Sequence, residues 1–128
     1  MSLIFDNGQY TEFYGGGKRG IVTPLNIYYN LAASSSTVLV AGVAGKRIRV
    51  LSLLLGSQTA TATNALFISS IGPINLQVYN IAGNATAGAL YQSDENGLTD
   101  TGTSAGLSCN VGAAAAAFVS IKYVIYTP

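Results

Sequence analysis

Three of the five acidic residues lie in one short segment, Asp94-Glu95-Asn96-Gly97-Leu98-Thr99-Asp100, and are the first candidates for a reactive or ligand-binding site. Carboxylate oxygens gathered on a loop suit a hard cation such as Ca²⁺, but this segment lacks the alternating ligands and the distal Glu of an EF-hand. A glycosidase would need two carboxylates that face each other across a sugar. We interpret the segment as a solvated loop, and its binding of calcium or of a glycan stays open.

Other catalytic groups are scarce in this chain. Its 128 residues include no His, no Trp and one Cys, with six basic and five acidic residues. Cys109 has no histidine to activate it, and catalysis needs titratable groups collected in a cleft. Because Cys109 would share one face of a strand with Leu107 and Val111, we interpret it as a buried thiol. The sequence predicts a protein that is not an enzyme and has no catalytic residue, metal or cofactor.

The segment Gly42-Val43-Ala44-Gly45-Lys46-Arg47 has the composition of a phosphate-binding loop but not its spacing. A P-loop places four residues between its glycines and a Ser or Thr after the Lys, and a helix follows it. Here the flanking segments have the composition of strands. The segment is therefore predicted to be a turn between two strands, without nucleotide.

Charge and hydropathy argue against nucleic acid and membrane as partners. The net charge is +1, so no overall electrostatic field attracts nucleic acid or an anionic membrane surface. Residues 50–93 carry no charge, but polar residues interrupt them every few positions, and a spanning helix needs about 20 predominantly apolar residues. Residues 1–7 show no basic region followed by an apolar core. We expect a protein that is soluble and cytoplasmic when it is made.

From Pro24 onward the pattern is typical of β-structure. Short segments rich in Val, Ile, Thr and Tyr alternate with turn signals such as Gly83-Asn84 and Asn96-Gly97. Regular punctuation of this kind predicts an all-β, antiparallel sandwich or barrel over residues 26–128. The alanines at 113–117 follow a Gly and lead into a β-rich segment, so no helix is expected there. The predicted strands are 26–30, 36–41, 46–55, 65–69, 76–81, 87–92, 106–111 and 115–127.

Residues 1–25 differ from the rest of the chain. Aromatic residues are spaced through a polar segment that ends in Gly15-Gly16-Gly17-Lys18-Arg19-Gly20, and no strand or helix period is evident. We predict an extended N-terminal arm that cannot bury its aromatics against itself and lies across another surface. A frayed tail is the equal alternative. The aromatic residues are Phe5, Tyr10, Phe13 and Tyr14.

Two predicted strands are apolar on both faces near their ends. In the strand from Lys46, strict alternation places Ile48 and Val50 on one face and Leu51 and Leu53 on the other. The strand that ends the chain is similar. Antiparallel sheets usually keep one face in water, so two apolar faces require a second layer. That layer is either a neighbouring subunit or an extended loop of the same chain.

Residues 35–51 read Ser35-Ser36-Thr37-Val38-Leu39-Val40-Ala41-Gly42-Val43-Ala44-Gly45-Lys46-Arg47-Ile48-Arg49-Val50-Leu51. This order of a Thr/Val-rich strand, an Ala-Gly turn and a Lys-Arg-Ile-Arg-Val strand resembles a module of tailed-bacteriophage virion proteins. The closing segment 112–127 fits the same pattern. The resemblance covers residues 26–127. It implies a jelly-roll capsid decoration (cement) protein, often trimeric, or a module of a tail or head fibre.

As a decoration protein, the chain is expected on the capsid exterior as a homotrimer bound to the major capsid protein. The arm would supply the contacts, and basic residues would pair with carboxylates of the shell. A fibre module would instead bind a host receptor or glycan through loops such as 94–106. The arm residues expected at the partner are Phe5, Tyr10, Phe13, Tyr14, Lys18 and Arg19, and the next candidates are Arg47 and Arg49.

Overall fold

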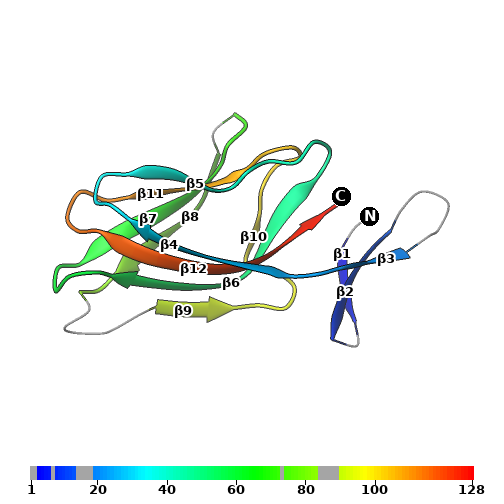
Figure 1. The fold of residues 1–128 in the computed structure, drawn as a ribbon, viewed down its shortest axis with the longest axis horizontal. Helices are drawn as coiled ribbons and strands as arrows, with labels where there is room; N and C mark the ends of the chain where they lie inside the picture. Colours follow the sequence, from blue (N-terminus) through cyan, green and yellow to red (C-terminus); the bar gives the residue numbers. More distant parts are fainter. Residues whose placement is uncertain (1–2, 7, 14–18, 73, 84–89) are drawn as a thin grey trace.

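The computed structural model describes residues 3–6, 8–13, 19–72, 74–83 and 90–128 (Figure 1). Within these ranges the chain forms strands and no helix. The strands are β1 (Leu3–Asp6), β2 (Gln9–Phe13), β3 (Arg19–Val22), β4 (Leu25–Leu31), β5 (Ser36–Val40), β6 (Arg47–Ser57), β7 (Thr63–Ser69), β8 (Ile74–Ile81), β9 (Leu90–Ser93), β10 (Thr99–Asp100), β11 (Leu107–Val111) and β12 (Ala117–Tyr126).

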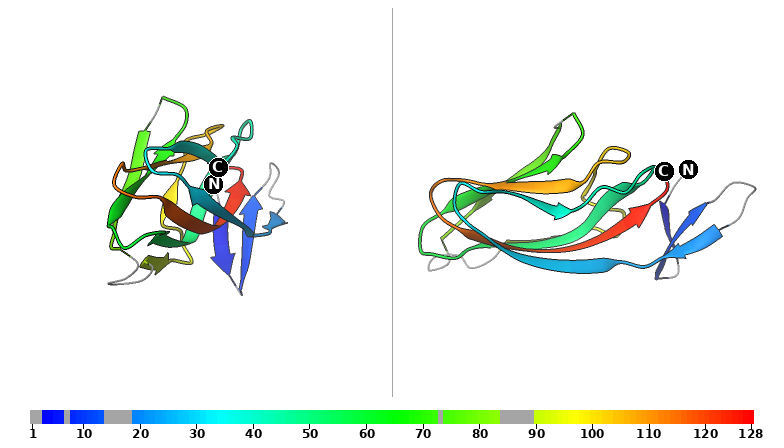
Figure 2. Two further views of the ribbon diagram at one scale, coloured as in Figure 1. Left: turned by 60° about the vertical axis from the view of Figure 1, so that its left-hand side comes forward. Right: turned by 45° about the horizontal axis from the view of Figure 1, so that its top comes forward.

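Two antiparallel sheets form a sandwich, which confirms the predicted all-β fold (Figure 2). The first sheet, called here the closing sheet, has the order β10-β6-β12-β4, and β9 also pairs with β6. The second, called the uncharged sheet, has the order β5-β11-β7-β8. No residue of its four strands is charged. The main core lies between these sheets.

Alternation along the strands builds the core. In β7 every second side chain is buried, and Phe67 stands edge-on to Tyr79 of β8 with ring centroids 5.8 Å apart. In β12 the side chains of Val119 and Ile121 are 1% exposed, whereas Lys122 points to solvent. Ala117 begins β12 after a turn, so the alanine run is not helical, as predicted. Period-two burial is what fixes these strands in register.

Residues 3–6, 9–13 and 19–22 form strands, although no strand period is evident in the sequence of this segment. β1, β2 and β3 make a three-stranded antiparallel sheet, called here the N-terminal sheet, with Tyr10 paired to Phe5 on one side and Val22 on the other. Gly8 takes a φ of 74° in the turn between β1 and β2, a conformation that favours glycine. The rings of Phe5 and Tyr10 lie 4.7 Å apart, and Tyr10 is buried together with residues of β6 and β12.

A β-bulge at Leu51 corrects the predicted alternation of β6. Lys122 pairs with Ser52 and Tyr123 pairs with Val50, so Leu51 is an extra residue in the ladder. Ile48 and Val50 therefore face the main core together with Leu53 and Leu55. Strict alternation predicted that Ile48 and Val50 lie on one face of the strand and that Leu53 and Leu55 lie on the other.

The bulge turns Leu51 toward the N-terminal sheet. There it forms a second core in which the second layer comes from the same chain. Part of the apolar excess predicted for a neighbouring subunit is thus covered internally. The buried residues of this second core are Leu3, Tyr10, Val22, Leu51, Val124 and Tyr126.

Candidate interaction sites

Arg49, a predicted partner contact, is paired within its own chain. Its Nε and a terminal nitrogen donate to the two carboxylate oxygens of Asp100 at 2.6 and 2.9 Å, because β10 pairs with β6 at these two residues. The guanidinium carbon also lies 4.9 Å from the ring centroid of Tyr126. The carboxylate raises the pKa of Arg49 well above its usual range. Arg47 donates its Nε to Thr103 Oγ1 at 3.1 Å and remains half-buried.

The predicted arm residues separate into two groups. Tyr10 is 7% exposed and its hydroxyl donates to the carbonyl oxygen of Glu95 at 2.9 Å, and Phe5 packs on the second core. Phe13 and Arg19 are backbone partners at the end of the β2–β3 pair. Tyr14 and Lys18 lie outside the described residues. Burial removes Tyr10 from the surface that a partner could contact.

Sequence reasoning did not identify Glu12, which fastens the N-terminal sheet to the sandwich. Its carboxylate is buried and accepts a hydrogen bond from the backbone N–H of Thr127. Lys46 Nζ lies 3.9 Å from the same carboxylate and donates to Thr127 Oγ1 at 3.1 Å. A lone Glu in a polar segment carries no sequence signal for such a role, because its partners come from the turn before β6 and the end of β12.

The carboxylates that the sequence groups at 94–100 diverge in the structure. Asp100 faces Arg49, whereas Asp94 caps its own turn by accepting from the backbone N–H of Asn96 at 2.8 Å. Glu95 is exposed. Among the described residues, no group of three or more His, Cys, Asp or Glu side chains could hold a metal ion.

Cys109 lies in the main core on β11 with an exposed fraction of 0%. Burial in apolar surroundings raises the pKa of its thiol to about 12. A thiol with such a high pKa is almost wholly protonated at neutral pH and is a poor nucleophile.

The outer face of the uncharged sheet is apolar at its centre. Registers place Val38 beside Ser108 and Ile68 in one row, and Leu66 beside Val78 in the next. Val38 and Val78 are 57% and 55% exposed. Serines and asparagines surround these side chains, so the face offers hydrogen-bonding groups but no charge.

The outer face of the closing sheet also exposes large side chains. Registers align Tyr28, Ser120, Leu54 and Tyr91 across four strands, and the two tyrosines are 59% and 65% exposed. The ring of Phe118 stacks on Tyr28 with centroids 6.3 Å apart. This row was not predicted, because β9 and β4 are far apart in the sequence.

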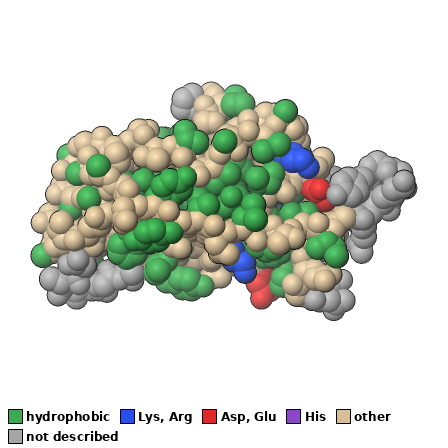
Figure 3. All heavy atoms as spheres, in the orientation of Figure 1, with side chains coloured by type: hydrophobic (Ala, Val, Ile, Leu, Met, Phe, Trp, Pro, Cys, Tyr) green, Lys and Arg blue, Asp and Glu red, His purple; other side chains and the backbone are tan. Residues whose placement is uncertain are grey.

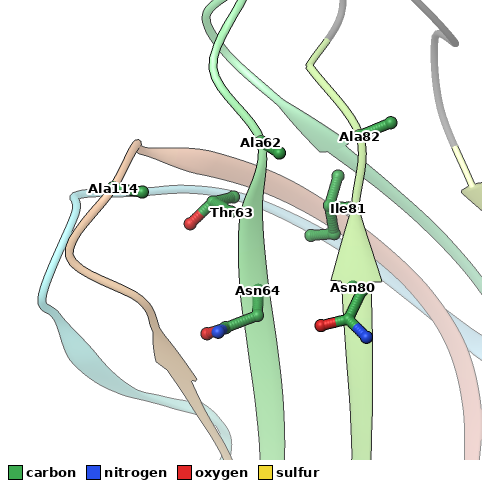
Figure 4. Close-up of a pocket in the computed structure, with 7 residues that line it drawn as sticks. All are labelled: Ala62, Thr63, Asn64, Asn80, Ile81, Ala82 and Ala114. Carbon is green, nitrogen blue, oxygen red and sulfur yellow. The ribbon is translucent and has the colours of Figure 1, made fainter.

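A shallow hollow of about 480 Å³ lies between the start of β7, the end of β8 and the turn before β12 (Figure 4). Thr63 Oγ1 is buried there and has no hydrogen-bond partner within the described part of the chain. None of the described residues that line the hollow has an ionisable side chain. Its lining is Ala62, Thr63, Asn64, Asn80, Ile81, Ala82 and Ala114.

Comparisons with known proteins add no relative. No protein-family model, curated protein or solved structure matches this chain. The described residues contain no helix with the length and hydropathy to span a membrane.

Proposed function

We propose that this protein is a non-enzymatic structural protein of a bacteriophage virion, a decoration protein that stabilises the head by bridging major capsid subunits. It works as a homotrimer on the capsid exterior and is assembled in the host cytoplasm. The sequence resemblance at residues 35–51 suggests this class, and the observations below support it. None of these roles requires a cofactor, nucleic acid or membrane.

Strand pairing supports a jelly roll. Starting from β4, the first strands of the sandwich pair with the last ones taken in reverse: β4 with β12, β5 with β11, β6 with β9 and β10, and β7 with β8. A long hairpin that folds over on itself has this pairing, and two packed sheets of the jelly-roll type result. Viral capsid proteins are among the proteins that use this architecture.

The observation that carries the proposal is the outer face of the uncharged sheet. A neighbouring copy in the trimer can pack on this face without desolvating any charge on it, and charged residues are depleted at the centres of protein interfaces. Val38 and Val78 are each more than half exposed, although a side chain of this size gains about 1.5–3 kcal/mol on full burial. We assign self-association to this face.

Charged side chains gather in the other half of the molecule. Figure 3 shows them only in the half of that view that holds β10 and the N-terminal sheet. We assign contact with the shell to this half, at the β2–β3 pair with Phe13, Tyr14, Lys18 and Arg19. Basic residues there would pair with capsid carboxylates. Arg49 is left out of this contact because Asp100 already neutralises it.

Two measurements test the proposal. Electron microscopy of the native particle should show density of this protein on the head shell, and sedimentation velocity should show a trimer. Val38→Lys and Val78→Lys place a charge on the uncharged face at exposed positions, so they should give a folded monomer. Val43→Lys, in the turn before β6, is the matched control and should stay trimeric.

Density at the tail would instead support a fibre or receptor-binding module. A wild-type protein that sediments as a monomer and leaves the shell bare would refute both assignments.

A further inference from the structure

A cleft of about 360 Å³ opens where the N-terminal sheet meets the outer face of the closing sheet. Four parts of the chain build it: the β1–β2 hairpin, Pro24 between β3 and β4, the centre of β6 and β12, and β9 with the turn that follows it. It is lined by Phe5, Gly8, Tyr10, Pro24, Leu51, Ser52, Tyr91, Ser93, Asp94, Glu95 and Lys122.

Backbone pairing fixes the polar groups of this cleft in place. Ser52 is the register partner of Lys122 on one side and of Ser93 on the other, so the three residues form one row across the sheet. The following turn is tied to β6 by the hydrogen bond from Asp94 N to Leu51 O at 2.9 Å. Such a preformed, concave site with a few convergent polar groups is typical of ligand binding.

The hydroxyl of Tyr10 holds the opposite wall against this turn through its hydrogen bond to the Glu95 carbonyl. The Glu95 carboxylate and the Lys122 ammonium themselves have no hydrogen bond or ion pair to any described residue. Both are exposed. The buried Tyr10 thus holds the turn at Glu95 in place, while the Glu95 carboxylate itself is exposed to solvent.

The mixture of charges selects the chemistry of the ligand. A cation would be attracted by Asp94 and Glu95 but repelled by Lys122. An anion would be attracted by Lys122 but repelled by the two carboxylates. A neutral polyhydroxyl ligand satisfies both, because its hydroxyls donate to carboxylates and accept from an ammonium group. The exposed ring of Tyr91 offers a flat apolar surface beside these groups, which suits the C–H face of a pyranose ring.

We propose that this cleft binds a neutral saccharide, with the Tyr91 ring as the stacking surface and Glu95 and Lys122 as hydrogen-bonding partners. This binding activity goes beyond the structural role proposed above, which does not need it. Three copies of the site on one trimer would also strengthen an individually weak interaction by avidity.

The test is a glycan-array screen of the labelled full-length protein, followed by NMR titration with the methyl glycoside of the sugar that binds. Amide shifts should map to Ser52, Tyr91, Ser93 and Glu95. Tyr91→Ala and Glu95→Gln should each weaken binding by about tenfold, the effect of one lost stacking or charge-assisted contact.

Tyr28→Ala is the matched control, since Tyr28 is an equally exposed tyrosine of the same sheet face outside the cleft. It should leave saccharide affinity unchanged. The proposal is overturned if no neutral glycan on the array binds, if Tyr28→Ala weakens binding as much as Tyr91→Ala does, or if a zwitterionic amino acid gives the same shifts as the sugar. Each of these results leaves the capsid proposal standing, because attachment to the shell is measured separately by microscopy.

Discussion

Asp100 accepts hydrogen bonds from two different strands, which makes it the most connected carboxylate among the described residues. Arg49 of β6 donates to both of its oxygens, and the hydroxyl of Tyr126 in β12 donates to Oδ2 at 2.9 Å. The pair is partly shielded, with side-chain exposures of 21% for Arg49 and 29% for Asp100. Short charge-assisted bonds of this kind are stronger than neutral ones.

Asp100→Asn should therefore lower the free energy of unfolding by about 1–2 kcal/mol. The amide is uncharged and has one acceptor oxygen, so it cannot accept both hydrogen bonds that Arg49 donates to the carboxylate. Urea unfolding followed by circular dichroism measures the loss. Glu95→Gln, which neutralises an exposed carboxylate that bonds to no other described residue, should stay within about 0.5 kcal/mol of the wild type. Equal effects of the two variants would contradict the structural role of Asp100.

Cys109 gives a prediction about alkaline pH. Its pKa is raised to about 12 in the folded protein, so the folded state keeps a proton that the unfolded chain releases above about pH 8.5. Burial raises the pKa of Tyr126 in the same direction. The free energy of unfolding should be constant at neutral pH and should fall as the pH rises from about 9 toward 12.

Cys109→Ala removes one of these protons, so its stability should fall less steeply over the same pH interval. Chemical denaturation at a series of pH values measures both slopes. Identical slopes for wild type and variant would show that the thiol ionises with its usual pKa in the folded protein.

At the scale of elements, the sequence predicted strands whose burial follows a local period and missed those whose burial does not. β4 and β12 were found within two residues of their bounds because burial alternates over residues 26–31 of β4 and 117–123 of β12. β1, β2 and β3 have only four or five residues each. Their apolar side chains pack on Leu51, Val124 and Tyr126, which no local pattern links to them.

The bulge at Leu51 could not be predicted for a similar reason. The strand contains four leucines, and nothing in the sequence distinguishes Leu51 from the other three. Only the pairing with β12 shows that Leu51 is the extra residue. The cleft was missed because it joins the β1–β2 hairpin to the turn after β9. The sequence had singled out Tyr10 and the 94–100 segment separately, but not their contact.

Leu51→Ala should loosen the N-terminal sheet selectively. The side chain is 2% exposed, and removing a buried leucine costs about 2–5 kcal/mol. Here the loss falls on the second core, so hydrogen exchange should accelerate first in residues 3–22. Leu53→Ala, equally buried but in the main core, should instead accelerate exchange throughout the sandwich. The same exchange pattern in both variants would show that the two cores unfold as one.

At the scale of the whole molecule, charge is concentrated in one half and absent from a complete sheet. Deleting residues 1–22 would be a poor test of shell binding, because it would expose Leu51, Val124 and Tyr126. Solution conditions separate the two proposed surfaces better than a truncation does. Screening weakens interactions between exposed charges as the Debye length shortens, whereas apolar contacts are not weakened by salt.

Raising the ionic strength from about 0.01 M to about 1 M, which shortens the Debye length from about 30 Å to about 3 Å, should leave self-association intact and release the protein from the shell. Sedimentation velocity of the free protein and co-sedimentation with heads measure the two effects. Dissociation of the oligomer by salt would show that ion pairs, and not the uncharged sheet, hold the copies together.

The position of β12 has a consequence for biosynthesis. This strand lies between β6 and β4 in the closing sheet. β6 and β4 therefore cannot join the same sheet until residues 117–126 have left the ribosome. Nascent chains that end before Ala117 can pair one edge of β6 with β9 and β10 but leave its other edge open, and pairing between distant segments is slow. A premature stop codon before Ala117 should therefore yield aggregates and protease fragments, not a shortened sandwich.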